Sequence, residues 1–204
     1  MRKLDILQVG EPMLRQRARP LSVEEIRSPA IQELIGVMSE TMRQAPGVGL
    51  AAPQIGYGIQ VAVIEDRAEY LAGFSAAALT ERDRAPVPLH VIVNPRLSIV
   101  DDTAVVFFEG CLSLDGFAAI VPRARAVRVD CLNEGGESQV IQAHGWYARI
   151  LQHEIDHLDG TLYIDRMLAR SFMSADNLAQ HWRDKTMTEI YAAIDLGTRR
   201  PPHA

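Results

Sequence analysis

The sequence predicts one domain in which helices and antiparallel β-strands occupy separate parts of the chain. Apolar residues recur at helical spacing between residues 31 and 42, and a second helical pattern runs from residue 145 to 158. Between them, residues 60–132 consist of short runs that are rich in β-branched side chains. We therefore expect a group of strands that is preceded and followed by helices.

Local signals mark where these elements begin and end. Ser28 followed by Pro29 is typical of a helix N-terminus, and Pro46-Gly47 ends that helix. Four runs are predicted as strands: residues 61–64, 90–93, 103–108 and 124–131. The turn sequence at residues 133–136 joins two such runs and predicts an antiparallel hairpin.

The remaining segments are less regular. Residues 66–88 combine many charges and two prolines with little periodicity, so a long surface loop is expected there, with a partly ordered segment as the equal alternative. A last helix is expected over residues 174–194. Because no repeat or shift in composition marks a boundary, residues 1–204 are predicted as a single domain with a flexible tail at about 196–204.

The composition argues against several classes of protein. The 204 residues are 48% hydrophobic and 23% charged, which fits a folded domain with an ordinary core. The formal net charge of −5 argues against a nucleic-acid partner. No apolar run approaches the roughly 18 residues of a bilayer span, and no secretory signal follows the first basic residues, so we expect a cytoplasmic protein without membrane contact.

One short segment has the spacing of a metal site. In His153-Glu154-Ile155-Asp156-His157 both imidazoles fall on one face of the predicted helix, one turn apart, which suits two ligands of one metal ion. Glu154 lies next to the first histidine, where a carboxylate can take a proton from water at the ion. The alternative is an amphipathic helix whose histidines bind no metal.

A metal held by two histidines needs at least one more protein ligand. Cys111 is the best candidate, because it follows an apolar run and because Gly110 permits close approach of the backbone to an ion. A free cysteine beside a strand is more often a small buried hydrophobe, and Cys131 is assigned that role. A thiolate with two imidazoles accepts Fe(2+), Co(2+), Ni(2+) or Zn(2+), so these ligands alone do not name the ion.

A glycine-rich segment, Gly47-Val48-Gly49-Leu50-Ala51-Ala52-Pro53-Gln54, partly matches the fingerprint of dinucleotide-binding loops. Such a loop follows a strand and opens a helix, whereas here a helical pattern precedes the glycines and Pro53 would interrupt a helix that began after them. The remaining interpretations are a tight turn, or a loop at which the backbone and Gln54 approach a substrate.

Taken together, residues 47–54, 109–113 and 153–157 resemble the three motifs of the peptide deformylase family. The resemblance extends through residues 10–15, 94–95, 121–123, 158–160 and 165–166. It implies an α+β fold with mostly antiparallel sheets around a central helix that carries the His-Glu-x-x-His metal motif, with N-terminal and C-terminal helices.

The resemblance also implies a role for each candidate site residue. The metal ligands would be Cys111, His153 and His157. Glu154 would act as general acid and base, and Gln54 with the Leu112 backbone amide would stabilise the oxyanion. The substrate backbone would pair with Val48, Gly49 and Gly110.

The implied reaction is removal of the N-formyl group from the initiator methionine of nascent polypeptides, with release of formate. The resemblance favours Fe(2+) as the native ion, for which Zn(2+), Ni(2+) or Co(2+) substitute. The expected partners are formyl-methionyl nascent peptides, with transient ribosome contact, no specific nucleic acid and no membrane.

One segment departs from the common pattern of the family. Bacterial members commonly have an arginine within the segment that corresponds to residues 114–120, whereas this chain has Ala118. This segment is closer to the mitochondrial type, although Leu112 keeps the usual bacterial residue.

Two alternative functions remain. A zinc endopeptidase shares the two-histidine helix but takes its third ligand downstream of that helix, whereas Cys111 lies upstream. A metal-binding or ribosome-associated protein without the reaction is the other alternative, against which Glu154 and Gln54 argue.

Overall fold

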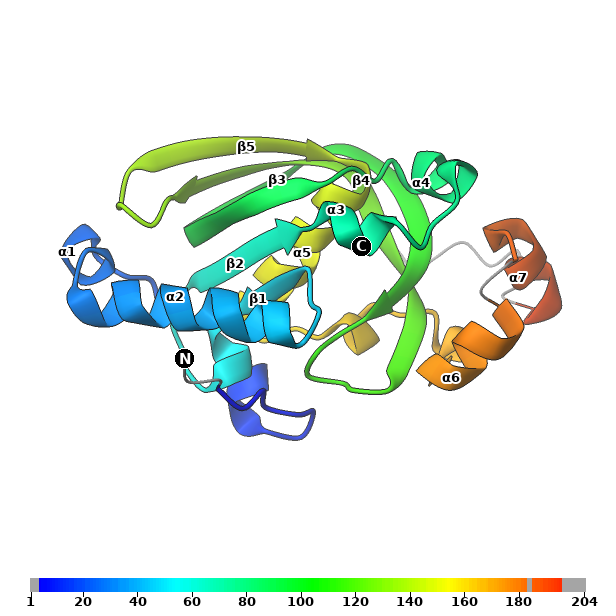
Figure 1. Ribbon diagram of the computed structural model, residues 1–204, viewed down its shortest axis with the longest axis horizontal. Coiled ribbons are helices and arrows are strands. Elements are labelled where there is room, and N and C mark those ends of the chain that lie inside the picture. Colours follow the sequence, from blue (N-terminus) through cyan, green and yellow to red (C-terminus); the bar gives the residue numbers. More distant parts are fainter. Residues whose placement is uncertain (1–3, 183–184, 196–204) are drawn as a thin grey trace.

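The computed structural model describes residues 4–182 and 185–195. The strands are β1 (Gly49–Ala51), β2 (Val61–Asp66), β3 (Val87–Gly110), β4 (Phe117–Leu132), β5 (Ser138–His144) and β6 (Met173–Ser174). The α-helices are α1 (Val23–Ile26), α2 (Pro29–Gln44), α3 (Ala68–Leu71), α4 (Ala76–Arg82), α5 (Gly145–Leu158), α6 (Ala175–Asn177) and α7 (Met187–Ala193). Figure 1 shows their arrangement.

The strands form one sheet in the order β1-β2-β3-β4-β5, and the short β6 pairs with the start of β4. Every pairing between these strands is antiparallel. The predicted hairpin at residues 133–136 is confirmed, because β4 and β5 pair from Leu132 and Ser138 onward. The predicted runs 90–93 and 103–108 belong to one long strand, β3, whose pairing with β4 is interrupted by register shifts near Val93, Ile99 and Asp101.

Strand β2 is buried on both faces, which explains its continuous apolar run. Val61 and Val63 pack with α2, whereas Ala62 and Ile64 pack with α5, because successive side chains of a strand point to opposite faces. Figure 1 accordingly shows α2 and α5 on either side of the sheet. The expected α+β fold, with mostly antiparallel strands around a helix that carries the histidines, is confirmed.

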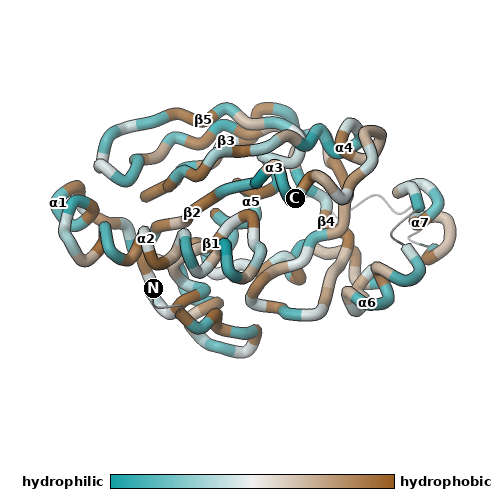
Figure 2. The backbone as a smooth tube through the Cα atoms, in the orientation of Figure 1, coloured by the Kyte–Doolittle hydropathy of each residue, from teal (hydrophilic) through white to brown (hydrophobic). Residues whose placement is uncertain are grey.

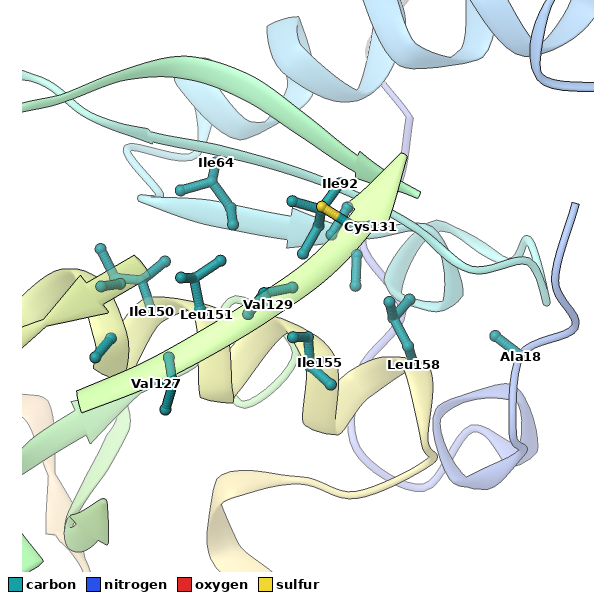
Figure 3. Packing of buried hydrophobic residues seen from close by; sticks show 14 residues of the cluster. Ala18, Ile64, Ile92, Val127, Val129, Cys131, Ile150, Leu151, Ile155 and Leu158 are labelled. Carbon is teal, nitrogen blue, oxygen red and sulfur yellow. The ribbon is translucent and has the colours of Figure 1, made fainter. Parts of the chain in front are cut away.

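Helix α5 is held against the sheet by its apolar side chains. Figure 3 shows Ile150, Leu151, Ile155 and Leu158 of α5 beside residues of β2, β3 and β4. Full burial of each such side chain stabilises the fold by about 1.5–3 kcal/mol. The packing therefore fixes the helix face on which His153 and His157 lie.

Helix α2 begins as the sequence predicts. Ser28 caps the helix by accepting a hydrogen bond from the amide of Ile31, and Pro29 is the first helical residue. In Figure 2 apolar and polar residues alternate along α2, as expected for a helix with one buried face. The helix ends at Gln44, just before Pro46-Gly47.

Two expectations differ from the structure. Residues 66–88 are not a plain loop, because α3 and α4 lie within them and β3 begins at Val87. The prediction of one helix over residues 174–194 is wrong. Helix α6 is followed by a π-helical turn at Leu178–Trp182, and α7 begins separately where Thr186 and Glu189 form a capping box.

The expected tail at about 196–204 lies outside the described residues. No described helix is long and apolar enough to span a bilayer.

Candidate metal centre and active site

The structure brings together the three side chains that the sequence analysis proposed as metal ligands. Cys111 lies directly after β3, and His153 and His157 lie one turn apart on α5. One potential ligand atom from each residue lies within 4.8 Å of the other two, and the distance from Cys111 Sγ to His157 Nε2 is 3.2 Å. Across residues 4–182 and 185–195 no other group of histidine, cysteine and acidic side chains has this geometry.

A buried carboxylate fixes the orientation of His153. Glu109 of β3 lies 3.0 Å from His153 Nδ1, so that ring nitrogen is engaged and Nε2 remains for a metal. Glu109 also accepts hydrogen bonds from both Arg123 of β4, at 2.9 Å, and Arg149 of α5, at 2.6 Å. Arg123 reaches in turn to Asp156, so strands β3 and β4 and helix α5 are joined at the centre.

The charges of this network follow from its geometry. Burial alone would raise the pKa of Glu109, but the Arg123 guanidinium and the hydrogen bond from His153 hold it well below its ordinary value. Burial would lower the pKa of His153, but hydrogen bonds to Cys111 and Glu109 raise it above the ordinary value. A cation at the ligand atoms would therefore compete with a proton on this ring.

His157 has the opposite character. Burial, followed by the nearby charge of His153, lowers its pKa well below the ordinary value, so the ring stays neutral. A neutral imidazole is the form that binds a metal. Its Nε2 faces the Cys111 sulfur, whereas its Nδ1 is buried without a hydrogen-bond partner in the described chain.

Glu154 lies at the same centre but makes a different set of contacts. It is buried, and that burial raises its pKa to about 7. Its Oε2 atom is buried and has no hydrogen-bond partner among the described residues. A buried oxygen of this kind, beside a thiol and two imidazoles, fits a site for a divalent cation and a water molecule.

Gln54 and Leu112 offer hydrogen-bond donors to the same space. The Gln54 side-chain oxygen accepts a hydrogen bond from the Ala51 amide at 2.8 Å, which directs its Nε2 toward Ser113 Oγ, at 3.2 Å, and Cys111 Sγ, at 3.6 Å. Within the part of the chain that the structure describes, the Leu112 amide donates no hydrogen bond. Both groups can therefore bind an oxygen atom near the thiol.

Gln54, Leu112 and Glu154 line a cavity of about 370 Å³ together with Cys111 and His153. Val48, Gly49 and Gly110, the three residues proposed to pair with a substrate backbone, all line the cavity. Strand β1, which includes Gly49, is at the edge of the sheet, where an extended peptide can add as a further strand. Phe108, Trp146 and Ile150 contribute apolar side chains to the lining.

The sequence analysis missed three functional neighbours. Glu109 belongs to the motif at residues 109–113, but the sequence analysis assigns it no role in the site. An acidic residue at the end of an apolar run is nevertheless a sign of a buried ion pair. Arg149 lies four residues before His153 and therefore on the same face of α5, which is a second usable signal. Arg84, from the segment 66–88, also lines the cavity, and no local pattern indicates it.

Comparison with known proteins gives consistent results. The family model for polypeptide deformylase matches residues 3–172. Peptide deformylase 1A, chloroplastic, of Solanum lycopersicum is 47% identical over 85% of this chain and 63% of that protein, so the chain spans less than two thirds of this relative. Peptide deformylase 3 of Streptomyces avermitilis is 41% identical over 94% of this chain and 83% of that protein. The Met-Ala-Ser-bound class I type b peptide deformylase of Acinetobacter baumannii superimposes with a TM-score of 0.72 at 32% identity, over 81% of this chain and 99% of that one.

Proposed function

Because the chain belongs to the peptide deformylase family, we propose that it is a metal-dependent hydrolase that removes the N-formyl group from the initiator methionine of nascent polypeptides and releases formate. The observation that carries this proposal is the convergence of Cys111, His153 and His157 within 4.8 Å beside the unpaired Glu154 carboxylate. A thiolate and two imidazoles leave a position open on a divalent ion, and an adjacent buried acid can take a proton from water there, so these groups suit metal-assisted hydrolysis of an amide.

Cys111, His153 and His157 would hold one divalent ion. When bound, that ion supplies the positive charge that makes water a nucleophile near neutral pH and polarises a carbonyl oxygen. The resemblance favours Fe(2+), and the mixed thiolate and imidazole ligands support Fe(2+), Zn(2+), Ni(2+) or Co(2+) alike. Glu109 acts by holding the His153 ring with its Nε2 toward the site.

Glu154 would move the proton of the reaction. Its carboxylate accepts a proton from the water that attacks the formyl carbon, and it returns the proton to the nitrogen as the carbon–nitrogen bond breaks. The products are formate and a free amino terminus. A pKa raised to about 7 by burial suits a group that must both accept and donate a proton near neutral pH.

Gln54 Nε2 and the Leu112 amide would stabilise the oxyanion that forms when water adds to the formyl group. Each preorganised donor of this kind lowers a barrier by about 3–4 kcal/mol in other enzymes. The bond from the Ala51 amide to Gln54 supports this role, because it fixes which end of the amide faces the site. Backbone groups of Val48, Gly49 and Gly110 would align the peptide between β1 and the end of β3.

The cavity also suits a methionine side chain. Its walls of Phe108, Trp146 and Ile150 are apolar, and an unbranched thioether makes favourable contacts with aromatic rings.

We further propose that the protein acts in a cytoplasm, on peptides as they leave the ribosome. The relative from Streptomyces is bacterial, whereas the tomato relative is described as chloroplastic.

The test is turnover of formyl-Met-Ala-Ser by the full chain loaded with Fe(2+) without oxygen, or with Ni(2+), followed by formate release. Acetyl-Met-Ala-Ser and an unformylated longer peptide serve as comparisons. We expect formate from the first substrate and no cleavage of the others. Cleavage of internal peptide bonds would establish an endopeptidase, and a metal-loaded protein without turnover would establish a metal-binding protein that lacks the reaction.

A matched variant separates chemistry from metal binding. Glu154→Gln keeps the size of the side chain and removes its charge, so we expect wild-type metal content and loss of nearly all formate release. Cys111→Ala removes the softest ligand and should lower the metal content instead. Full activity of Glu154→Gln would refute the assignment of the proton carrier.

A further inference from the structure

An aromatic pair is exposed to solvent beside the cavity. Phe117, the first residue of β4, is 46% exposed, and Phe172, which precedes β6, is 41% exposed. Their rings stack with centroids 5.1 Å apart and an angle of 9° between the planes. Two stacked rings on the surface form a flat apolar face, which is less common than a single exposed apolar side chain.

The backbone on both sides of the pair is fixed. Phe117 is paired with Ser174, and Ala118 with Met173, in the ladder between β4 and β6. The amide of Ala175 donates a hydrogen bond to the carbonyl oxygen of Gly116 at 2.8 Å. The two rings are therefore held at this place before any ligand arrives, which lowers the entropic cost of binding.

Phe117 also lines the cavity, as do its neighbours Gly116 and Ala175. The backbone carbonyl of Phe117 lies 3.6 Å from the position that a Cβ atom of Gly110 would take. The pair thus lies next to Gly110 and extends from the cavity lining to the exposed surface. A peptide with its backbone between β1 and Gly110 would pass this face after its first residue.

Among the described residues, the charged side chains that line the cavity lie at the candidate metal centre or are held in an ion pair. Glu109, Arg149, His153 and Glu154 surround the candidate metal centre. Arg84 is paired with Asp66 in a bidentate ion pair at 2.7 and 2.9 Å. Phe117 and the lining residues nearest to it in the described fold, Gly116 and Ala175, carry no charge, so this part of the wall offers an apolar contact and no cation for an acidic side chain.

We propose that Phe117 and Phe172 form a platform that binds the side chain of the second or third residue of the formyl-methionyl peptide and favours aromatic and large aliphatic side chains over acidic ones. This inference rests on the proposed function of the site. Phe117 makes the contact, and Phe172, which does not line the cavity, positions it by stacking. The negative charge density on an aromatic face disfavours carboxylates, whereas its apolar area packs with aliphatic and aromatic side chains.

The experiment compares kcat/KM for formyl-Met-X-Ser and formyl-Met-Ala-X, with X as Phe, Leu, Ala or Asp. We expect the Phe peptide to exceed the Ala peptide about three- to tenfold at one of these positions, as one aromatic contact predicts, with Asp lowest. The difference should appear in KM rather than in kcat. Phe117→Ser and Phe172→Ser should each reduce the ratio of Phe to Ala toward one, and Phe172→Tyr should retain it.

Tyr57→Ser is the matched control, because Tyr57 is also 46% exposed but does not line the cavity, and it should leave the ratio unchanged. Metal content and circular dichroism verify that each variant is folded. If Phe117→Ser does not fold, Phe117→Leu replaces it in the comparison. Absence of formate from every peptide would reject the proposed function itself. Formate release with equal kcat/KM for all four residues, or a preference that persists in the Phe117 and Phe172 variants, would reject only the platform.

Discussion

Gly49 lies against the side chain of Glu154 so closely that a Cβ atom at position 49 would lie 2.7 Å from Glu154 Cγ and closer still to the carboxylate. Gly49 is the first residue of β1 and is paired with Ile64 of β2, so its backbone has little freedom to withdraw. Glu154 is on α5, which is packed against the sheet. The absence of a side chain at Gly49 therefore determines where the proposed proton carrier lies.

Gly49→Ala should consequently displace the Glu154 carboxylate while leaving the three proposed metal ligands in place. We expect a loss of about 10²-fold or more in kcat/KM, which is what a displacement of roughly 1 Å costs in other enzymes. Formate release and metal content measured on the same preparation would test this. Gly36→Ala is the matched control, since a Cβ atom there meets nothing within 4 Å, and a Gly49→Ala variant as active as Gly36→Ala would contradict the relationship.

Local patterns explain why much of the site could be predicted from the sequence. The spacing of His153 and His157 places both rings on one helix face whatever the rest of the fold does. Ser28 and Pro29 likewise determine the start of α2 through contacts within a few residues. The hairpin at 133–136 depends on its turn residues in the same way.

Contacts between distant residues could not be predicted in this way. Glu109 meets Arg123 because residues 104–110 of β3 pair without interruption with residues 118–124 of β4. The apolar pattern of either strand alone does not give the register between them. The sequence analysis predicts one helix over residues 174–194, whereas in the structure the capping box of Thr186 and Glu189 begins a new helix.

Glu109→Gln should weaken metal binding, although Glu109 is not a ligand. The carboxylate holds His153 Nδ1 at 3.0 Å, and changes to such partners lower metal affinity about 10- to 100-fold in other proteins. Competition with a chelator gives the affinity. Glu65→Gln is the control, because Glu65 makes a comparable bidentate ion pair with Arg43 near the surface, and equal affinities of the two variants would contradict the proposed role.

The same carboxylate predicts how stability depends on pH. The pKa of Glu109 is held below its ordinary value in the fold, so in the unfolded chain, with a pKa of about 4.3, this group binds a proton more readily. Its contribution to the free energy of unfolding is therefore complete above about pH 5 and declines as the pH falls further.

Urea unfolding in the presence of a chelator, between pH 7 and pH 3, would measure this decline. Wild type should exceed Glu109→Gln in stability most strongly at pH 7, and the difference should narrow below about pH 4.3. A difference that is constant over the whole range would contradict the depressed pKa of Glu109.

Arg84→Met should destabilise the fold strongly. Arg84 and Asp66 are almost fully buried, with side chains 7% and 0% exposed, and their atoms meet at 2.7 Å. Removal of one partner leaves an uncompensated buried charge, which costs about 3–5 kcal/mol in other proteins. The guanidinium also lies 5.0 Å from the ring centroid of Trp146, so its loss should loosen the inner cavity wall.

Two causes of the lower stability of Arg84→Met can be separated: the unpaired, buried charge of Asp66 and the loss of packing by the arginine side chain. In Arg67→Met, the surface pair of Arg67 with Glu69 is broken, and because these side chains are 39% and 67% exposed the loss should stay below about 1 kcal/mol. Adding Asp66→Leu to Arg84→Met removes the unpaired carboxylate, so the double variant should be more stable than Arg84→Met in urea unfolding. A double variant that is less stable than Arg84→Met would show that Asp66 is satisfied by other groups and that packing of the arginine side chain dominates.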